Sequence, residues 1–79
     1  MVKFTRYSEV MRARPDRAEI QLEWIQRVVD QPERERIQED GRIRRWAVIP
    51  EAGNRYLRVI LLADGTTVHN AFFDRSDRP

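Results

Sequence analysis

Apolar residues along this chain recur first with a helical period and later with the period of a β-strand. Between residues 18 and 30 they are separated by four, three and four positions, the spacing of a helix that buries one face. This stripe consists of Ala18, Leu22, Ile25 and Val29, and it is widened by Trp24 and Val28. Asp16 is placed to cap the helix and Pro32 to end it. We therefore predict a helix that packs this stripe against the rest of the fold.

A shorter helix is expected ahead of it, over residues 5–14. Pro15 should stop this helix, because proline disfavours the helical conformation for the residue that precedes it. The N-terminal part of the chain is thus expected to hold two helices.

Beyond residue 32 the pattern alternates with period two and turn signals recur, as a β-meander requires. Asp40-Gly41 and Asp64-Gly65 both suit type I′ turns, in which both central residues take positive φ. If each turn is a two-residue loop, Arg36 faces Arg45 in the first hairpin and Leu61 faces Val68 in the second. The loop over residues 50–54 leaves the register between the hairpins open. The sequence predicts an α+β fold in one domain over residues 1–79: two N-terminal helices followed by a four-stranded antiparallel β-meander, with a helix packed on one sheet face.

The pairing in the second hairpin separates an apolar face from a mixed face. The apolar face, expected to bury against the second helix, consists of Leu57, Val59, Leu61, Val68 and Phe72. The mixed face carries Tyr56, Arg58, Ile60, Thr67, His69, Ala71 and Phe73. Functional side chains of this hairpin are therefore expected on the mixed face.

The charged residues give limited information about the binding partner. Fifteen basic against thirteen acidic side chains give a net charge of only +2, too small for a strong long-range field. All but one of the basic residues are arginine, whose planar fork matches phosphate or carboxylate two bonds at a time. A GC-rich genome is the simpler explanation of the same bias.

Several functions are disfavoured by what the sequence lacks. The chain has no cysteine for a disulfide or a thiolate metal site, and no phosphate loop, His/Cys ligand spacing or hydrolase motif occurs. We therefore expect no metal and no cofactor. The longest apolar run, residues 59–63, is far short of a membrane span, and the N-terminus lacks the apolar stretch of a signal peptide. A cytoplasmic protein with no membrane contact is expected.

The strongest candidate for chemistry is His69, the only histidine of the chain and the residue type best suited to proton transfer near neutral pH. The predicted pairing sets it beside Ile60 and diagonal to Arg58, with Tyr56 further along the same strand. RNA cleavage needs a base for the 2′-hydroxyl proton, a cation for the phosphate and an acid for the leaving oxygen. His69, Arg58 and Tyr56 can divide these catalytic roles. A lone histidine on a half-exposed strand is also common as an ordinary surface residue.

The densest basic run follows the first turn. Like charges directly opposed across a hairpin destabilise it unless an anion offsets them. The predicted pairing therefore indicates a phosphate-binding site formed by Arg36, Arg42, Arg44 and Arg45. Four acidic residues between positions 33 and 40 offer an equally simple alternative, a solvated network of ion pairs.

Motifs that carry a family resemblance follow one another along nearly the whole chain. In order they are Arg14-Pro15, Glu23-Trp24-Ile25, Pro32, Asp40-Gly41-Arg42, Arg44-Arg45-Trp46, Tyr56-Leu57-Arg58-Val59, Asp64-Gly65 and Ala71-Phe72-Phe73-Asp74-Arg75. This order resembles a family of small uncharacterised bacterial domains, itself similar to toxins of the RelE and BrnT type. The resemblance implies a ribosome-dependent or free ribonuclease that needs no metal and is encoded beside a small antitoxin. Family members are expected to carry a histidine in the first helix, where this chain has Tyr7-Ser8.

These observations lead to a toxin-like, metal-independent ribonuclease as the expected function, with His69 as acid or base. Its expected partners are RNA or the ribosome and a small antitoxin-like protein. The alternative is a non-catalytic interaction module whose mixed face docks another protein. A homodimer formed through an open sheet edge is a third possibility, which the many charges between residues 33 and 39 disfavour.

Overall fold

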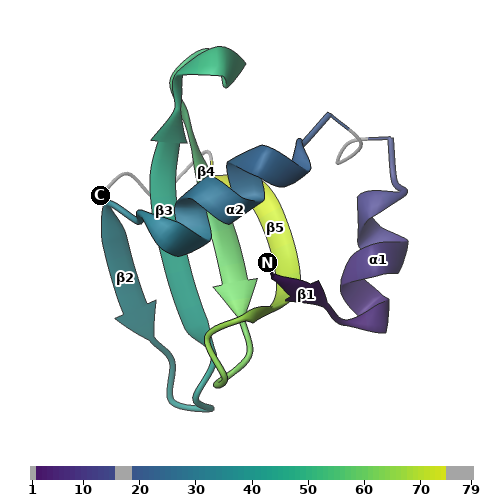
Figure 1. Cartoon of the computed structure of the whole chain (residues 1–79), viewed down its shortest axis with the longest axis vertical. Coiled ribbons are helices and arrows are strands. Elements are labelled where there is room, and N and C mark those ends of the chain that lie inside the picture. The colour runs from purple at the N-terminus through teal and green to yellow at the C-terminus, as the bar shows by residue number, and fades with distance from the viewer. Residues whose placement is uncertain (1, 16–18, 75–79) are drawn as a thin grey trace.

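The computed structural model describes residues 2–15 and 19–74, which form two helices and a five-stranded sheet (Figure 1). The elements in chain order are β1 (Lys3–Phe4), α1 (Arg6–Arg12), α2 (Leu22–Asp30), β2 (Arg34–Ile37), β3 (Ile43–Ile49), the 3₁₀ turn η1 (Pro50–Ala52), β4 (Arg55–Leu61) and β5 (Thr67–Asp74). No helix in these ranges is long and apolar enough to cross a membrane.

The protein is α+β, but the predicted architecture of two helices followed by a four-stranded antiparallel meander is wrong. A strand, β1, precedes both helices and pairs in parallel with β5, so the sheet is mixed and has the order β1-β5-β4-β3-β2. Strand β1 is only two residues long, and no periodicity can be read from so short a segment. Its partner lies at the other end of the chain, so this pairing depends on the tertiary fold.

Both helices are shorter than predicted. In α1, the Thr5 hydroxyl accepts the Ser8 N–H at 3.1 Å, and the helix ends at Arg12, before Pro15. Helix α2 begins at Leu22 with Gln21 at the N-cap position, whereas the predicted cap Asp16 lies outside the described residues. Leu22 is 46% exposed, contrary to its predicted place on the buried stripe. The buried residues of α2 are Trp24, Ile25, Val28 and Val29.

The two Asp-Gly turns close one residue earlier than predicted. The Gly41 N–H donates to the Gln38 carbonyl at 3.0 Å, and the Gly65 N–H donates to the Leu62 carbonyl at 2.9 Å. Each glycine is thus the last residue of its turn, with φ of 91° and 74°. In the first hairpin the strands consequently pair one residue out of the predicted register, so that Arg36 faces Arg44 and not Arg45.

A β-bulge at His69 changes the register of the second hairpin. Leu61 faces Val68 as predicted, but Ile60 faces Asn70, which leaves His69 as the extra residue of the bulge. Beyond the bulge every side chain points to the opposite face from the one predicted, because strand faces alternate at each residue. Phe73 therefore joins the helix-side core, and Phe72 turns away from it.

Helix α2 crosses one face of the sheet, as Figure 1 shows, and the hydrophobic core lies between them. Its buried members are Ile20, Trp24, Ile25, Val28, Val29, Ala47, Ile49, Leu57, Val59, Leu61, Val68 and Ala71. Helix α1 stands to the side, next to β5 and β1 (Figure 1). No helix of residues 2–15 and 19–74 covers the sheet face opposite α2, which is called the open face below.

Candidate nucleic-acid interface

Three arginines lie on the open face near the sheet edge formed by β2. Strand pairing sets Arg36 directly opposite Arg44 and sets Arg34 opposite Trp46, whose neighbour Ala47 points into the helix-side core. The Arg34 guanidinium lies 5.4 Å from the centre of a Trp46 ring. Within the described ranges, neither Arg34 nor Arg36 forms a salt bridge with a carboxylate. Arg36 therefore faces a like charge across the strands and has no ion-pair partner among the described residues.

Among the described side chains, the polar group of Gln38 lies against Arg44. With the amide oxygen of Gln38 turned towards it, the Arg44 Nη2 donates to that oxygen at 2.6 Å. A shallow hollow of about 550 Å³ at the hairpin tip is lined by Arg36, Ile37, Gln38, Glu39, Asp40 and Arg44. The two opposed arginines thus share this hollow with two carboxylates, so its charge is mixed.

At the centre of the open face, Arg58 forms a cluster with Asp74, Trp46 and Phe72. Its guanidinium forms an ion pair with Asp74 and lies 5.2 Å from the ring centres of Trp46 and Phe72. Asp74 also accepts a hydrogen bond from the Trp46 indole nitrogen at 3.2 Å, and its side chain is 4% exposed. Asp74 thus offsets the charge of Arg58, so a phosphate would compete with this carboxylate. The cluster also accounts for Trp46, which is 1% exposed although it does not face α2.

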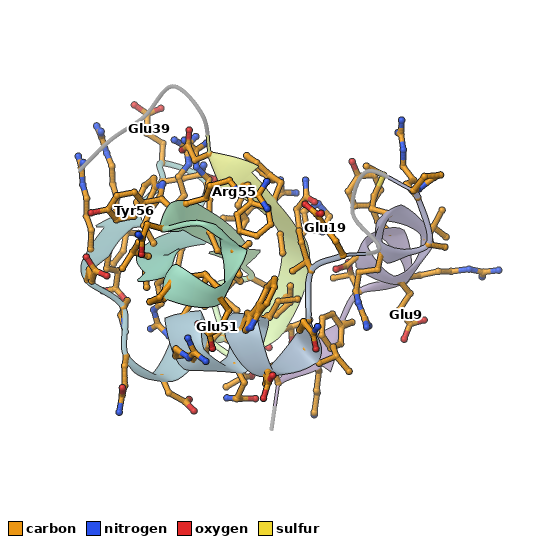
Figure 2. All side chains as sticks on the ribbon, turned by 90° about the horizontal axis from the view of Figure 1, so that it is seen from above. Glu9, Glu19, Glu39, Glu51, Arg55 and Tyr56 are labelled. Carbon is orange, nitrogen blue, oxygen red and sulfur yellow. The ribbon has the colours of Figure 1, made fainter. Side chains whose placement is uncertain are left out.

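Tyr56 lies beside this cluster on β4, two residues before Arg58, and faces Val48 and Asp74 on the neighbouring strands. Figure 2 shows it on the side of the sheet away from α2. Tyr56 and Phe72 are both half-buried. Aromatic side chains on a basic sheet can stack unpaired bases.

Two of the predicted phosphate ligands lie elsewhere. Arg45 points to the helix side, where its Nε donates to Glu35 at 2.6 Å and its Nη1 donates to the Val29 carbonyl at 2.9 Å. This arginine therefore stabilises the C-terminal end of α2. Arg42 is exposed in the turn and lies 3.6 Å from the Asp40 carboxylate. The alternative of an ion-pair network thus describes Arg45 and Arg42, but not Arg36.

His69 lies with α1 and not with Arg58. Its Nδ1 is 3.3 Å from the Thr5 hydroxyl oxygen, and its ring stacks on Tyr7 with centroids 5.0 Å apart and planes 23° apart. The bulge also moves it one position further along β5 from Arg58 than predicted. The three predicted catalytic residues therefore divide into Tyr56 and Arg58 on the open face and His69 beside α1.

Sequence reasoning missed the residues that hold these groups in place, namely Thr5, Tyr7, Gln38 and Asp74. Thr5 carried a usable signal, because a threonine directly before a helical segment is a common N-cap. Nothing in the local sequence indicates that Tyr7 meets His69 across the fold. Among the described residues, no group of three or more His, Asp and Glu side chains is arranged to hold a metal ion.

Comparison with known proteins identified no relative of this chain. No protein-family model matches the chain, and no curated protein or solved structure is significantly similar to it. The resemblance to RelE and BrnT toxins therefore stays a prediction, and a functional proposal for this protein depends on the arrangement of its own residues.

Proposed function

We propose that the protein binds single-stranded RNA on its open face, as a toxin-like RNA-handling domain would. The observation that carries this proposal is the pairing of Arg36 directly opposite Arg44. Like charges facing each other across two strands destabilise the pair, and an anion between them removes that repulsion. A phosphodiester, like a carboxylate, has oxygens that fit guanidinium forks.

Aromatic side chains on the same face support RNA in single-stranded form as the ligand. Tyr56 and Phe72 offer half-buried rings on strands β4 and β5, while the arginines lie on β2 and β3. Stacking on such rings requires bases that are not already stacked within a duplex. With phosphate contacts at the β2 edge and base contacts towards the centre of the sheet, an RNA strand would lie across the open face.

The proposal is tested by the salt dependence of RNA binding. For single strands the logarithm of affinity falls with a slope of about 0.7 per phosphate contact, so the variant Arg36→Ala/Arg44→Ala should lower the slope by about 1.4. The measurement is fluorescence anisotropy of a labelled oligonucleotide across a salt series. Arg27→Ala is the matched control, because Arg27 is an arginine of α2 that pairs with Glu51 on the other side of the sheet.

Two results would reject RNA binding by this face. One is the absence of binding at low salt, which would favour the alternative of a protein-interaction module. The other is an unchanged slope in the double variant, which would mean that the opposed arginines do not contact phosphate.

A second candidate function, metal-independent RNA cleavage, is favoured by the way His69 is held. Tyr7 stacks on one side of the ring and Thr5 lies within 3.3 Å of Nδ1, so the ring orientation is set, and no described residue forms a hydrogen bond with Nε2. In this reaction His69 would remove the 2′-hydroxyl proton or protonate the leaving oxygen.

Cleavage of a labelled RNA in the presence of a chelator is the test of this second function. We expect His69→Ala to reduce the rate by about a hundredfold or more, the usual contribution of an acid or base. Tyr7→Phe keeps the stacked ring and should retain most of the activity. RNA affinity should be unchanged in both variants. Cleavage that persists in His69→Ala would remove His69 from the mechanism and leave the binding proposal intact.

A further inference from the structure

Most of the exposed large apolar side chains among the described residues lie on the two helices. Among the described residues, the large apolar side chains classed as exposed are Tyr7, Val10, Leu22 and Ile37. Tyr7 and Val10 lie on α1, three positions apart, and Arg6 is four positions before Val10. Residues at these spacings are neighbours on a helix surface. Arg6, Tyr7 and Val10 are called the α1 strip below, a surface that is apolar and basic.

A groove with the opposite charge lies between β1 and α2. It has a volume of about 540 Å³ and is lined by Val2, Phe4, Leu22, Glu23, Gln26 and Asp30. The Gln26 side chain accepts the Val2 N–H at 3.1 Å and donates to Asp30 at 2.9 Å, which links the strand to the helix. The only ionisable residues in this lining are carboxylates, and neither forms a salt bridge with a described residue. The groove is therefore apolar and acidic.

We propose that the groove binds the α1 strip of a second copy of this chain. The two surfaces match in both respects, since Val10 and Tyr7 supply apolar side chains for Val2, Phe4 and Leu22, and Arg6 supplies a positive charge for the acidic groove. Val10 is 64% exposed and Leu22 is 46% exposed, so the contact would remove apolar surface from water on both partners.

Helix α1 borders the groove with the side opposite the α1 strip, because Arg12 lies six positions after Arg6 on the helix. The Arg12 guanidinium of α1 lies 4.6 Å from the ring centre of Phe4, which lines the groove. Figure 1 likewise shows α1 next to β1. The α1 strip therefore faces away from its own groove, and two copies can exchange contacts about a two-fold axis, so that each strip fills the other groove. A domain of this size has a small core, and such a dimer would add to its stability.

The test is a complementation experiment by sedimentation velocity. We expect the wild-type protein to form dimers and the variants Val10→Asp and Leu22→Asp to associate at least about tenfold more weakly. Val10→Asp keeps an intact groove and Leu22→Asp keeps an intact strip, so an equimolar mixture should associate more strongly than either variant alone. Ile37→Asp is the matched control, because Ile37 is equally exposed but lies on β2, and it should behave as the wild type.

The charge pairing is tested separately by Arg6→Glu and Glu23→Arg, which change exposed side chains only. Each should weaken dimer formation, and mixing the two should restore it. Far-ultraviolet circular dichroism of each variant checks that the fold is retained. A wild-type protein that stays monomeric at all concentrations overturns the proposal. So does a mixture of Val10→Asp and Leu22→Asp that associates no better than its components, or an Ile37→Asp variant that is equally impaired.

Discussion

Asp64 shows how one side chain closes the second hairpin. Its carboxylate accepts the N–H groups of Thr66 and Thr67, both at 2.9 Å, and also the Thr67 hydroxyl. The Thr67 hydroxyl is the main reason that the pKa of Asp64 falls from its ordinary value of 3.8 to about 2, and the two backbone N–H groups add to the effect. The ionised form therefore holds the turn.

The lowered pKa predicts how the protein responds to acid. Because the folded-state pKa of Asp64 lies below its ordinary value, this carboxylate stabilises the fold above pH 3.8, and the stabilisation is lost as the pH falls towards about 2. Asp64→Asn should therefore flatten the decline of the melting temperature over that range. Thr67→Val, which removes the main hydroxyl donor, should flatten it in part. The measurement is thermal unfolding by circular dichroism, and an acid profile unchanged in Asp64→Asn would contradict the prediction.

The β2–β3 hairpin shows how register assigns different roles to arginines of one run. Arg45 on the helix side joins Glu35 to the last turn of α2, whereas Arg36 faces Arg44 on the open face. The two roles have opposite consequences for stability. Arg45 donates hydrogen bonds to a carbonyl at the end of α2 and to a carboxylate, whereas Arg36 faces a like charge on the neighbouring strand.

Replacing Arg45 or Arg36 by glutamine is expected to affect the free energy of unfolding differently. Arg45→Gln should lower the free energy of unfolding by about 1–3 kcal/mol, since it loses charged hydrogen bonds at a partly buried site. Arg36→Gln should change the same quantity by less than about 0.5 kcal/mol, or raise it slightly. Urea unfolding of both variants measures the difference. Equal effects would mean that the two arginines are in equivalent surroundings, as the register predicted from a two-residue turn requires.

At the scale of the whole molecule, stability depends on one thin core between α2 and the sheet. Ile25 lies at its centre, fully buried together with Val28, Leu57 and Val59. A domain of this size is stabilised by only roughly 3–5 kcal/mol. Figure 2 shows how the loop residue Glu51 reaches α2, where Arg27 holds the pKa of its carboxyl at about 2. This pair is exposed, so the core carries most of the attachment between helix and sheet.

Truncation at the centre of the core should therefore unfold much of the protein. Ile25→Ala is expected to lower the free energy of unfolding by about 2–5 kcal/mol, close to the entire stability of such a domain. Ile25→Val removes one methyl group and should lower it by about 0.5–1.5 kcal/mol, leaving the fold intact. Circular dichroism at room temperature and urea titrations distinguish the two. A fully folded and cooperative Ile25→Ala protein would show that other contacts hold the helix.

Features with a local physical cause could be predicted. Three signals of this kind each indicated an element that the structure contains: the helical period of the α2 stripe, the proline after α1 and the glycines of both turns. Each depends on interactions within a few residues of the chain. The stripe was misplaced at Leu22 because helix spacing alone does not say where the first turn begins. Tyr56 and Arg58 were placed on the mixed face by alternation, whereas Arg44 was identified only as part of a basic run, and the neighbours of all three were missed.

From the residues alone follow the α+β class, the presence of two hairpins and the abundance of arginine on their strands, because periodicity and turn chemistry are local properties. The tertiary structure alone decides that β1 pairs with β5, that Arg36 faces Arg44 and that His69 lies against Thr5 and Tyr7. The physical reason is register. A shift of one residue at a turn or a bulge leaves the sequence pattern unchanged, yet it moves every later side chain to the other face of the sheet.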